Sequence, residues 1–338
     1  MKKILVSGGA GFIGSRFIQF MLNKYEEVNI INFDSLTYAG DLDNCKNFND
    51  NPRYTFINGD IRNYQSIVET FEKYDISGVI HFAAESHVDN SISNPSVFIE
   101  TNVLGTFNIL NVAYDFWMEG PNKYKKKYEH SKFHHISTDE VYGTLGDTGL
   151  FTEDTPYAPN SPYSASKASS DMIVRSYVET YGMNCTISNC SNNYGPNQHV
   201  EKLIPTIIKN ALQGKNIPIY GDGKYIRDWL FVDDHCSAID LVFHKGEKGH
   251  VYNVGGDDEK TNLEIVESIC TILDKKYPDR PNHNKLVEFV KDRAGHDRRY
   301  AIDSSKIKNT LGWKAITSFD RGIEKTINWY ISKLDEFQ

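Results

Sequence analysis

Over the first 190 residues, short apolar runs alternate with segments long enough to form helices. The apolar runs are bounded by polar and glycine-containing turns, which indicates buried strands. The predicted strands span residues 4–6, 28–33, 54–57, 78–82, 132–136 and 184–189, and the predicted helices span residues 12–23, 95–117 and 161–181. Strands that alternate with helices in this way predict an α/β fold, a doubly wound parallel sheet with helices on both faces.

After about Ser191 the pattern becomes mixed. Loops there are richer in Gly and Asp, as in residues 220–223, and helix-length segments recur near residues 204–212, 262–273 and 320–333. We therefore predict two domains, residues 1–190 and a smaller mixed α/β unit over residues 191–338, and leave open whether the chain crosses between them.

The composition is typical of a globular protein, and the net charge limits the classes of partner that we expect. Of the 338 residues, 39% are hydrophobic and 24% are charged, an ordinary globular profile. The net charge of −8 argues against nucleic acid or an anionic membrane as the main partner, because both attract basic surfaces. The sequence has no apolar run of about 20 residues that could span a membrane, and glycines and Arg16 interrupt its apolar start, unlike a secretory signal.

The cysteines and histidines make a structural metal or a disulfide framework improbable. The chain has five cysteines, an odd number, and no pair of them has Cys-x-x-Cys spacing. The histidines are scattered without His-x-x-x-His spacing, so no metal site is predicted. This cysteine usage fits a reducing compartment, and we expect a cytoplasmic protein.

Glycines follow the first predicted strand and open the first predicted helix. Gly8, Gly11 and Gly14 have Gly-x-x-Gly-x-x-Gly spacing, which lets the backbone turn tightly and approach a pyrophosphate at a helix N-terminus. Asp34 ends the second strand, where a carboxylate can accept hydrogen bonds from both ribose hydroxyls and would repel a 2′-phosphate. This context predicts a Rossmann-type domain that binds NAD rather than NADP. Asp60, after the third strand, is a candidate for the adenine edge.

Two further groups of residues carry candidate catalytic chemistry. Tyr163 and Lys167 are four residues apart on a predicted helix, so their side chains share one face. A nearby ammonium favours the phenolate, so Lys167 is expected to lower the pKa of Tyr163. Thr138, Asp139 and Glu140 follow the fifth predicted strand, at the carboxyl edge of the sheet where such folds bind ligands.

With these motifs the chain resembles the extended short-chain dehydrogenase/reductase family over essentially its whole length. The glycine loop and the Tyr-x-x-x-Lys pair are signatures of that family, whose members of this size act mainly on nucleotide-activated sugars. A closer resemblance, to the family's sugar dehydratases, is carried by residues 34–40, 81–89, 137–143, 191–196, 226–229 and 292–299. The chain departs from the family pattern at Ala294, where proline is frequent, and at Asp41, where asparagine is common.

The resemblance implies NAD-dependent dehydration of dTDP-glucose to dTDP-4-keto-6-deoxyglucose. Oxidation of C4 to a ketone makes the C5 proton removable, so that water can then leave between C5 and C6. By resemblance, Tyr163 takes the 4-hydroxyl proton beside Lys167, and Thr138 hydrogen-bonds both that hydroxyl and Tyr163. Glu140 removes the C5 proton, Asp139 protonates the leaving 6-hydroxyl, and hydride returns to C6.

The resemblance also implies binding residues and a dimer. The expected cofactor set is Gly8, Gly11, Phe12, Ile13, Gly14, Asp34, Ser35, Leu36, Thr37, Asp60, Ile61, Phe82, Ala83, Ala84, Ser86, Thr101, Tyr163, Lys167 and Asn193. The expected substrate set is Ser86, Thr138, Asn192, Lys202, Leu203, Pro218, Tyr220, Arg227, Asn262, Arg293 and His296. Arg227 and Arg293 match diphosphate-binding positions, whereas Arg298 and Arg299 are expected to form salt bridges. Relatives dimerise through two helices per subunit, which predicts a homodimer through residues 95–117 and 161–181.

Three other functions stay open at this point. The nearest is an epimerase, or a dehydratase of a UDP-, GDP- or CDP-linked hexose, because no simple sequence code separates thymine from uracil. The second is a non-catalytic NAD-binding sensor, which would have no use for Tyr163, Lys167 or the Asp139–Glu140 pair. The third is a metal-dependent lyase, and the scattered histidines count against it.

Overall fold

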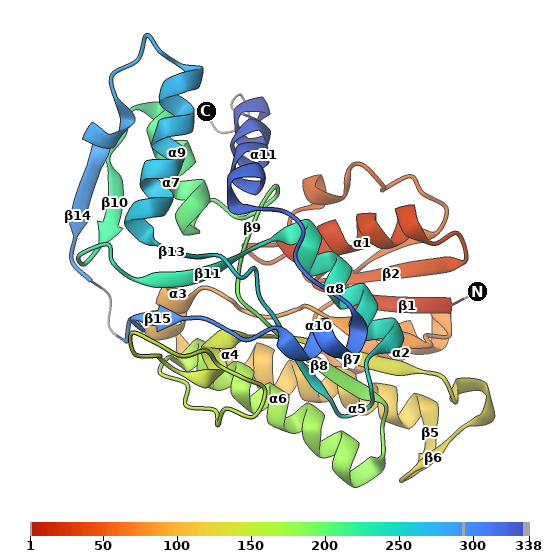
Figure 1. Cartoon of the computed structure of the whole chain (residues 1–338). Helices are drawn as coiled ribbons and strands as arrows, with labels where there is room; N and C mark the ends of the chain where they lie inside the picture. The colour runs from red at the N-terminus through yellow and green to blue at the C-terminus, as the bar shows by residue number, and fades with distance from the viewer. Residues whose placement is uncertain (1, 293–294, 334–338) are drawn as a thin grey trace.

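A seven-stranded parallel sheet forms the centre of the computed structural model, which describes residues 2–292 and 295–333 (Figure 1). The strand order is β12-β8-β7-β4-β1-β2-β3, and every neighbouring pair is parallel. The order reverses between β1 and β4, which is where ligands bind in such sheets. The strands are β1 (Lys2–Ser7), β2 (Val28–Asp34), β3 (Tyr54–Asn58), β4 (Gly78–His81), β7 (Lys132–Thr138), β8 (Cys185–Cys190) and β12 (Val251–Val254).

Helices cover both faces of this sheet (Figure 1). One face carries α1 (Phe12–Lys24) and α8 (Val232–Lys245), and the other carries α2 (Tyr64–Tyr74), α5 (Thr106–Trp117) and α6 (Pro162–Tyr181). Phe17 and Phe243 belong to the apolar core under the first pair, and Phe71 and Tyr177 belong to the core under the other three. The predicted doubly wound α/β fold is therefore confirmed, although the sequence pattern did not mark α2 or α8.

The helix predicted over residues 95–117 is continuous but changes its pitch. It begins as α4 (Pro95–Phe98), passes through the π-helical η2 (Ile99–Gly105) and continues as α5. The buried Asn102 lies in the π segment, where its side-chain oxygen accepts from the Glu85 amide at 2.8 Å and its amide donates to the Ser166 hydroxyl at 2.8 Å. Asn102 thus ties the loop after β4 to α6, and π turns of this kind are frequent at functional sites.

The second half of the chain builds smaller sheets around its own apolar core. β10 (Ile217–Tyr220) pairs with β14 (Val287–Val290), and β11 (Ile226–Phe231) pairs with β9 (Asn192–Tyr194), β13 (Glu259–Thr261) and β15 (Arg299–Tyr300). The packed helices are α7 (Leu203–Gln213), α9 (Asn262–Lys276) and α11 (Phe319–Ser332). Short elements complete the fold: α3 (Val88–Ser93), α10 (Ser305–Leu311), β5 (Met118–Gly120), β6 (Lys123–Tyr124), and the 3₁₀ turns η1 (Leu42–Cys45), η3 (Lys126–Tyr128), η4 (Asp139–Tyr142) and η5 (His283–Leu286).

The chain crosses back into the central sheet after residue 190. Strand β12 pairs in register with β8, from Val251 opposite Ile187 to Val254 opposite Cys190. Helix α8, which precedes β12, packs on α1, β7 and β8. One edge strand of the central sheet, β12, therefore comes from the second half of the chain. A functional division at residue 190 stays a prediction.

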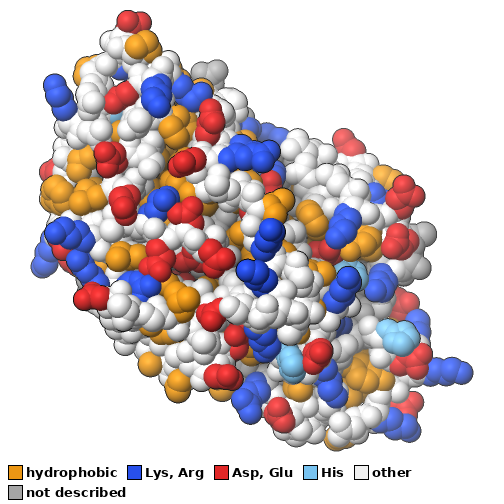
Figure 2. Space-filling model, viewed as in Figure 1, with side chains coloured by type: hydrophobic (Ala, Val, Ile, Leu, Met, Phe, Trp, Pro, Cys, Tyr) orange, Lys and Arg blue, Asp and Glu red, His pale blue; other side chains and the backbone are white. Residues whose placement is uncertain are grey.

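Charges are interspersed over the face in Figure 2, where Lys and Arg side chains alternate with Asp and Glu.

All five cysteines are free and buried. Within residues 2–292 and 295–333, no helix combines the length and the apolar character that a membrane crossing requires. The same residues contain no group of three or more His, Cys, Asp or Glu side chains placed to hold a metal ion.

Candidate active site

A cleft of about 320 Å³ opens at the carboxyl edge of the sheet, at the point where the strand order reverses. Its lining comes from the loop after β1, the ends of β2, β3, β4 and β7, the start of α6 and the residues after β8. All five predicted catalytic residues, Thr138, Asp139, Glu140, Tyr163 and Lys167, line this cleft. The topology thus brings together groups that are up to 29 positions apart in sequence.

The glycine loop leaves no room for side chains where the backbone turns. Gly8 has φ +72°, and a Cβ there would lie 2.7 Å from the Ala83 amide nitrogen. A Cβ on Gly14 would lie 2.3 Å from the Gly8 carbonyl oxygen. Gly11 is the N-cap of α1 and has no side chain to occupy the helix N-terminus, and the first turn carries no acidic residue. The loop therefore fits a pyrophosphate held by backbone N–H groups.

Asp34 presents a fixed carboxylate at the end of β2. One carboxylate oxygen accepts from the Ala10 amide at 2.9 Å and the other from the Leu36 amide at 2.8 Å. Burial raises the pKa of Asp34, and the two backbone hydrogen bonds partly offset the effect. Each oxygen retains a lone pair for a ribose hydroxyl. Leu36 was expected to bind the cofactor itself, but it lies off the cleft lining, with φ +52°; its amide donates to Asp34 and its side chain packs against the apolar core that contains Phe17.

The other residues of the expected cofactor set line the same cleft. They are Phe12, Ile13, Ser35, Thr37, Asp60, Ile61, Phe82, Ala83, Ala84, Ser86, Thr101 and Asn193. Sequence reasoning missed Arg62, which also lines the cleft and binds the Asp60 carboxylate at 2.6 Å. Burial would raise the pKa of Asp60, but the hydrogen bonds and charge of Arg62 lower it. The only sequence signal for Arg62 is its place two residues after Asp60.

The three residues after β7 form an acid–base pair on a tight turn. Thr138 is the N-cap of η4, and its hydroxyl accepts from the Glu140 amide and donates to an Asp139 carboxylate oxygen, both at 3.3 Å. Asp139 is 2% exposed, whereas Glu140 is half-buried. Burial, and then the charges of Glu140 and Asp228, raise the pKa of Asp139 well above its usual value. The protonated form of Asp139 is therefore favoured, which suits this group to act as an acid.

Tyr163 and Lys167 lie on successive turns at the start of α6, where a capping box between Ser161 and Ser164 fixes the first turn. The Lys167 ammonium donates to the Ile136 carbonyl at 2.8 Å, and the Thr138 side chain hydrogen-bonds Tyr163. The prediction that Lys167 lowers the pKa of Tyr163 is wrong for the described chain. Burial and the charge of Glu140 raise this pKa well above its usual value, so Tyr163 is protonated here.

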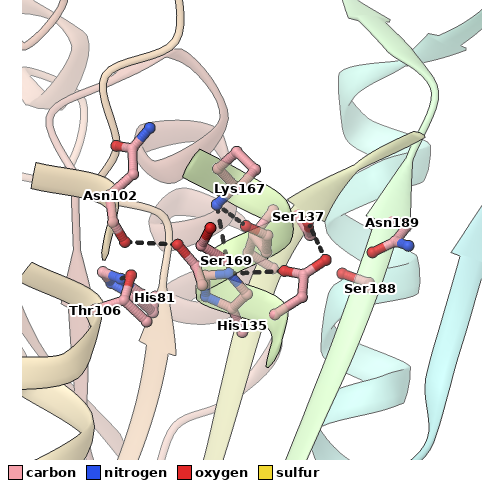
Figure 3. A network of polar contacts seen from close by, with 12 residues as sticks. His81, Asn102, Thr106, His135, Ser137, Lys167, Ser169, Ser188 and Asn189 are labelled. Atoms are coloured by element: carbon pink, nitrogen blue, oxygen red, sulfur yellow. Dashed lines mark hydrogen bonds and ion pairs between the residues drawn. The ribbon is translucent and has the colours of Figure 1, made fainter. Parts of the chain in front are cut away.

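A buried polar network lies behind Lys167 and was not predicted (Figure 3). The Nε2 atom of His135 lies 3.5 Å from the Lys167 Nζ and 3.2 Å from an Asp171 carboxylate oxygen. Ser137 donates to the other Asp171 oxygen at 2.8 Å. Asp171 stands four residues after Lys167, and this spacing is the sequence signal that could have revealed it.

The expected substrate residues separate into two groups. Ser86, Thr138, Asn192 and Lys202 line the cleft, and the Lys202 ammonium donates to the Ser86 carbonyl at 3.0 Å. The others lie off the cleft lining. Leu203 begins α7 directly after Lys202, and the rest lie on or beside β10 and β11: Pro218, Tyr220, Arg227, Asn262 and His296. Arg293 lies outside the described residues.

The second group gathers around His296 and Arg227. The His296 ring stacks on Tyr225 with ring centroids 3.7 Å apart and lies 6.4 Å from the Tyr220 ring. The Asn262 amide donates to the Tyr225 carbonyl at 3.1 Å. The Arg227 guanidinium is buried and donates to the Ile226 and Asp297 carbonyls at 2.7 and 2.9 Å. In this arrangement those two donors face the protein's own carbonyls.

The two remaining arginines behave as predicted. Arg298 forms an ion pair with Asp222 at 2.8 Å, and Arg299 forms one with Glu259 at 2.6 Å. Both predicted salt bridges are therefore confirmed. They anchor the segment that ends in β15 to neighbouring loops and strands.

Known proteins resemble this chain over nearly its full length. Residues 5–326 match the family model described as GDP-mannose 4,6 dehydratase. A dTDP-glucose 4,6-dehydratase of Neisseria meningitidis is 50% identical over 336 residues, which cover 98% of this chain and 94% of that protein.

Two crystal structures show the same fold. That of dTDP-glucose 4,6-dehydratase from Bacillus anthracis in complex with NAD has a TM-score of 0.87 and 49% identity, covering 99% of this chain and 98% of that one. That of the Streptomyces venezuelae enzyme with NAD and dTDP bound has a TM-score of 0.90 and 42% identity, with the same coverage. The family match and these likenesses span the cleft and both halves of the fold, so the chain belongs to the GDP-mannose 4,6 dehydratase family.

Proposed function

We propose that this chain dehydrates dTDP-glucose to dTDP-4-keto-6-deoxyglucose with NAD as its cofactor. The observation that carries the proposal is the buried Asp139, whose pKa burial raises, beside Glu140 in one cleft with Tyr163, Lys167 and the glycine loop. Elimination of water needs both an acid and a base at the sugar, whereas epimerisation at C4 needs neither of these carboxyl groups. The names of the relatives at about half identity support the thymidine nucleotide.

The residues at the mouth of the cleft fit NAD. The loop after β1 would hold the pyrophosphate, because Gly8 and Gly14 admit no side chain there and α1 offers free N–H groups. Asp34 would accept hydrogen bonds from the adenosine ribose. When bound, NAD supplies the hydride acceptor for C4, the hydride donor for C6, and a positive charge that favours the Tyr163 phenolate.

The protein's own residues move the protons. Tyr163 takes the proton of the 4-hydroxyl, with the Thr138 hydroxyl beside it and the Lys167 ammonium one turn away. The ketone at C4 then makes the C5 proton removable, and Glu140 takes it. Asp139, whose protonated form is favoured by burial, gives its proton to the departing 6-hydroxyl. Return of the proton from Glu140 to C5 completes the 4-keto-6-deoxy sugar.

Mass spectrometry of dTDP-glucose incubated with the protein and a trace of NAD tests this proposal. Loss of one water with many turnovers per NAD is expected. An isomer of unchanged mass would instead establish an epimerase, and parallel incubations with UDP-, GDP- and CDP-glucose test the base. The Asp139→Asn variant keeps the side-chain shape without the acidic proton and serves as the matched control for a contaminating enzyme.

We further propose that the protein forms a homodimer through η2, α5 and α6. Four large apolar side chains on these elements are exposed: Ile99 by 51%, Leu104 by 49%, Phe107 by 39% and Met172 by 50%. η2, α5 and α6 pack against one another, so these exposed side chains come from neighbouring elements, and exposed apolar surface of this kind marks interaction sites. Light scattering should give twice the chain mass for the wild type and the single chain mass for Phe107→Lys. A monomeric wild type would contradict the proposal.

We further propose that the protein works in a reducing compartment such as the cytoplasm. Its five cysteines are all buried as free thiols, and proteins of oxidising compartments more often pair theirs. Thiol titration of the denatured protein, purified without reductant, should count five thiols.

A further inference from the structure

A buried carboxylate stands behind the Lys167 ammonium, outside the lining of the cleft. Asp171 lies one helical turn beyond Lys167 on α6 and is 1% exposed. Tyr163, Lys167 and Asp171 follow one another at intervals of four, so the tyrosine, the ammonium and the carboxylate share one face of the helix. A buried ionised carboxylate is costly unless it is paired and hydrogen-bonded.

His135 on β7 lies beside both this carboxylate and the ammonium. Its Nε2 atom lies 3.2 Å from one Asp171 oxygen and 3.5 Å from the Lys167 Nζ (Figure 3). Its Nδ1 atom has no hydrogen-bond partner among the described residues. Burial lowers the pKa of His135 well below its usual value, so the ring is neutral. A neutral ring nitrogen cannot donate to Asp171 and accept from Lys167 at once, and that Asp171 oxygen has no hydrogen-bond partner among the described residues, so the Asp171 charge acts on Lys167 through space.

The second Asp171 oxygen is held from the opposite side. The Ser137 hydroxyl donates to it at 2.8 Å and the Tyr157 hydroxyl at 2.9 Å. These bonds fix the carboxylate and favour its ionised form. Burial still raises the pKa of Asp171 to about 6, so the carboxylate is ionised at neutral pH.

We propose that Asp171 is a positioning residue for the reaction: beside His135 it supplies the negative charge that keeps the Lys167 ammonium protonated and held against the Ile136 carbonyl, one turn from Tyr163. This inference rests on the proposed function. The alternative is that the network merely fastens α6 to the sheet, in which case the charge on Asp171 would not matter.

Among the described residues of this network, Asp171 is the group that presents a negative charge to Lys167. The other titratable groups packed on the pair come from β4, β7, β8 and two loops, and burial keeps all of them neutral: His81, His135, Cys190, Tyr142 and Tyr157. Burial already lowers the pKa of Lys167 to about 8, and Asp171 opposes that shift. Without the Asp171 charge, Lys167 becomes a buried cation with no counter-charge, and its pKa falls further.

Two substitutions move opposite limbs of the pH profile of kcat. In Asp171→Asn, the alkaline limb near pH 8 should move down by at least about one pH unit, so that kcat at pH 8 falls at least about fivefold while KM for dTDP-glucose stays within about twofold. In Tyr157→Phe, the carboxylate keeps its charge but loses one donor. Its pKa therefore rises, and the acid limb near pH 6 should move up while the alkaline limb stays in place.

A merely structural network predicts a different pattern. Asp171→Asn would then lower the thermal midpoint and leave both limbs of the profile where they are in the wild type, which overturns the proposal. If Asp171→Asn does not fold, an unmoved acid limb in Tyr157→Phe overturns it equally.

A readout without substrate separates this inference from the proposed function. Because Lys167 has a lower pKa in the folded chain than in the unfolded chain, it contributes a rise in the free energy of unfolding with pH from about 8 upward, whereas the buried cysteines, whose pKa values burial raises, contribute a fall. In Asp171→Asn this rise should begin at lower pH. The same onset in both proteins overturns the inference even if both dehydrate dTDP-glucose. A lower onset in a protein that turns over no nucleotide sugar supports the charge pairing and refutes the proposed function.

Discussion

Gly8→Ala is expected to disrupt the glycine loop in two ways that the structure allows us to estimate. Gly8 has φ +72°, a left-handed conformation that costs an L-residue about 1–2 kcal/mol. Its Cβ would also lie 2.7 and 2.8 Å from the Ala83 amide nitrogen and Cα. These are backbone atoms, so no rotamer change relieves the contact, and overpacking of this kind costs about 1–3 kcal/mol more. The free energy of unfolding should therefore fall by about 2–5 kcal/mol.

Gly214→Ala is the matched control for this prediction. Gly214 has a nearly equal φ of +67°, but a Cβ there would meet no atom within 4 Å. Urea denaturation should show the conformational cost alone, about 1–2 kcal/mol, and calorimetry should show NAD affinity unchanged, because Gly214 lies at the end of α7. Gly8→Ala should weaken NAD binding as well, because the displaced Ala83 lines the cleft. Equal losses of stability in the two variants would refute the reasoning.

Two further predictions concern the acid–base pair and a buried histidine. Glu140→Gln should still oxidise C4, seen as reduced-nicotinamide absorbance, but should form product at least about 100-fold more slowly; product at the normal rate would show that another group removes the C5 proton. His235 has a pKa lowered by burial to about 3, so the unfolded chain gains a proton there below about pH 6.5 that the folded chain does not. Stability should therefore fall less steeply with falling pH in His235→Asn, by up to about 1.4 kcal/mol per pH unit, in urea titrations at pH 7 and 5. The exposed His130→Asn should keep the wild-type slope, and an identical slope in His235→Asn would contradict the prediction.

Features encoded by neighbouring residues were predictable from the sequence. The buried parallel strands were recognisable because they are short and apolar throughout, and the glycine loop because its spacing and its place between a strand and a helix are local. The catalytic residues could also be brought together, because parallel strands and their following loops meet at one edge of the sheet. The cleft lining from Gly8 to Lys202 follows from these rules.

Features that depend on contacts distant in sequence were not predictable. The pKa of Tyr163 depends on burial and on Glu140, 23 residues earlier, and these outweigh Lys167. The Arg227 guanidinium donates to the Asp297 carbonyl, 70 residues away, a contact no local pattern reveals. The π segment at Asn102 has no signal in the apolar pattern, and neither do the hydrogen bonds of its side chain to Glu85 and Ser166.

The return of the chain through β12 also affects how the protein is made. Until Val254 has been synthesised, β8 presents an open edge, and 64 residues separate that point from Cys190. At about 5–20 residues per second, the unfinished sheet stays exposed on the ribosome for about 3–13 seconds. An exposed strand edge is a template for pairing with other chains. Slower translation between Cys190 and Val254 should therefore favour aggregation of the nascent protein. The residues whose synthesis is then delayed do not include the glycine loop that follows β1.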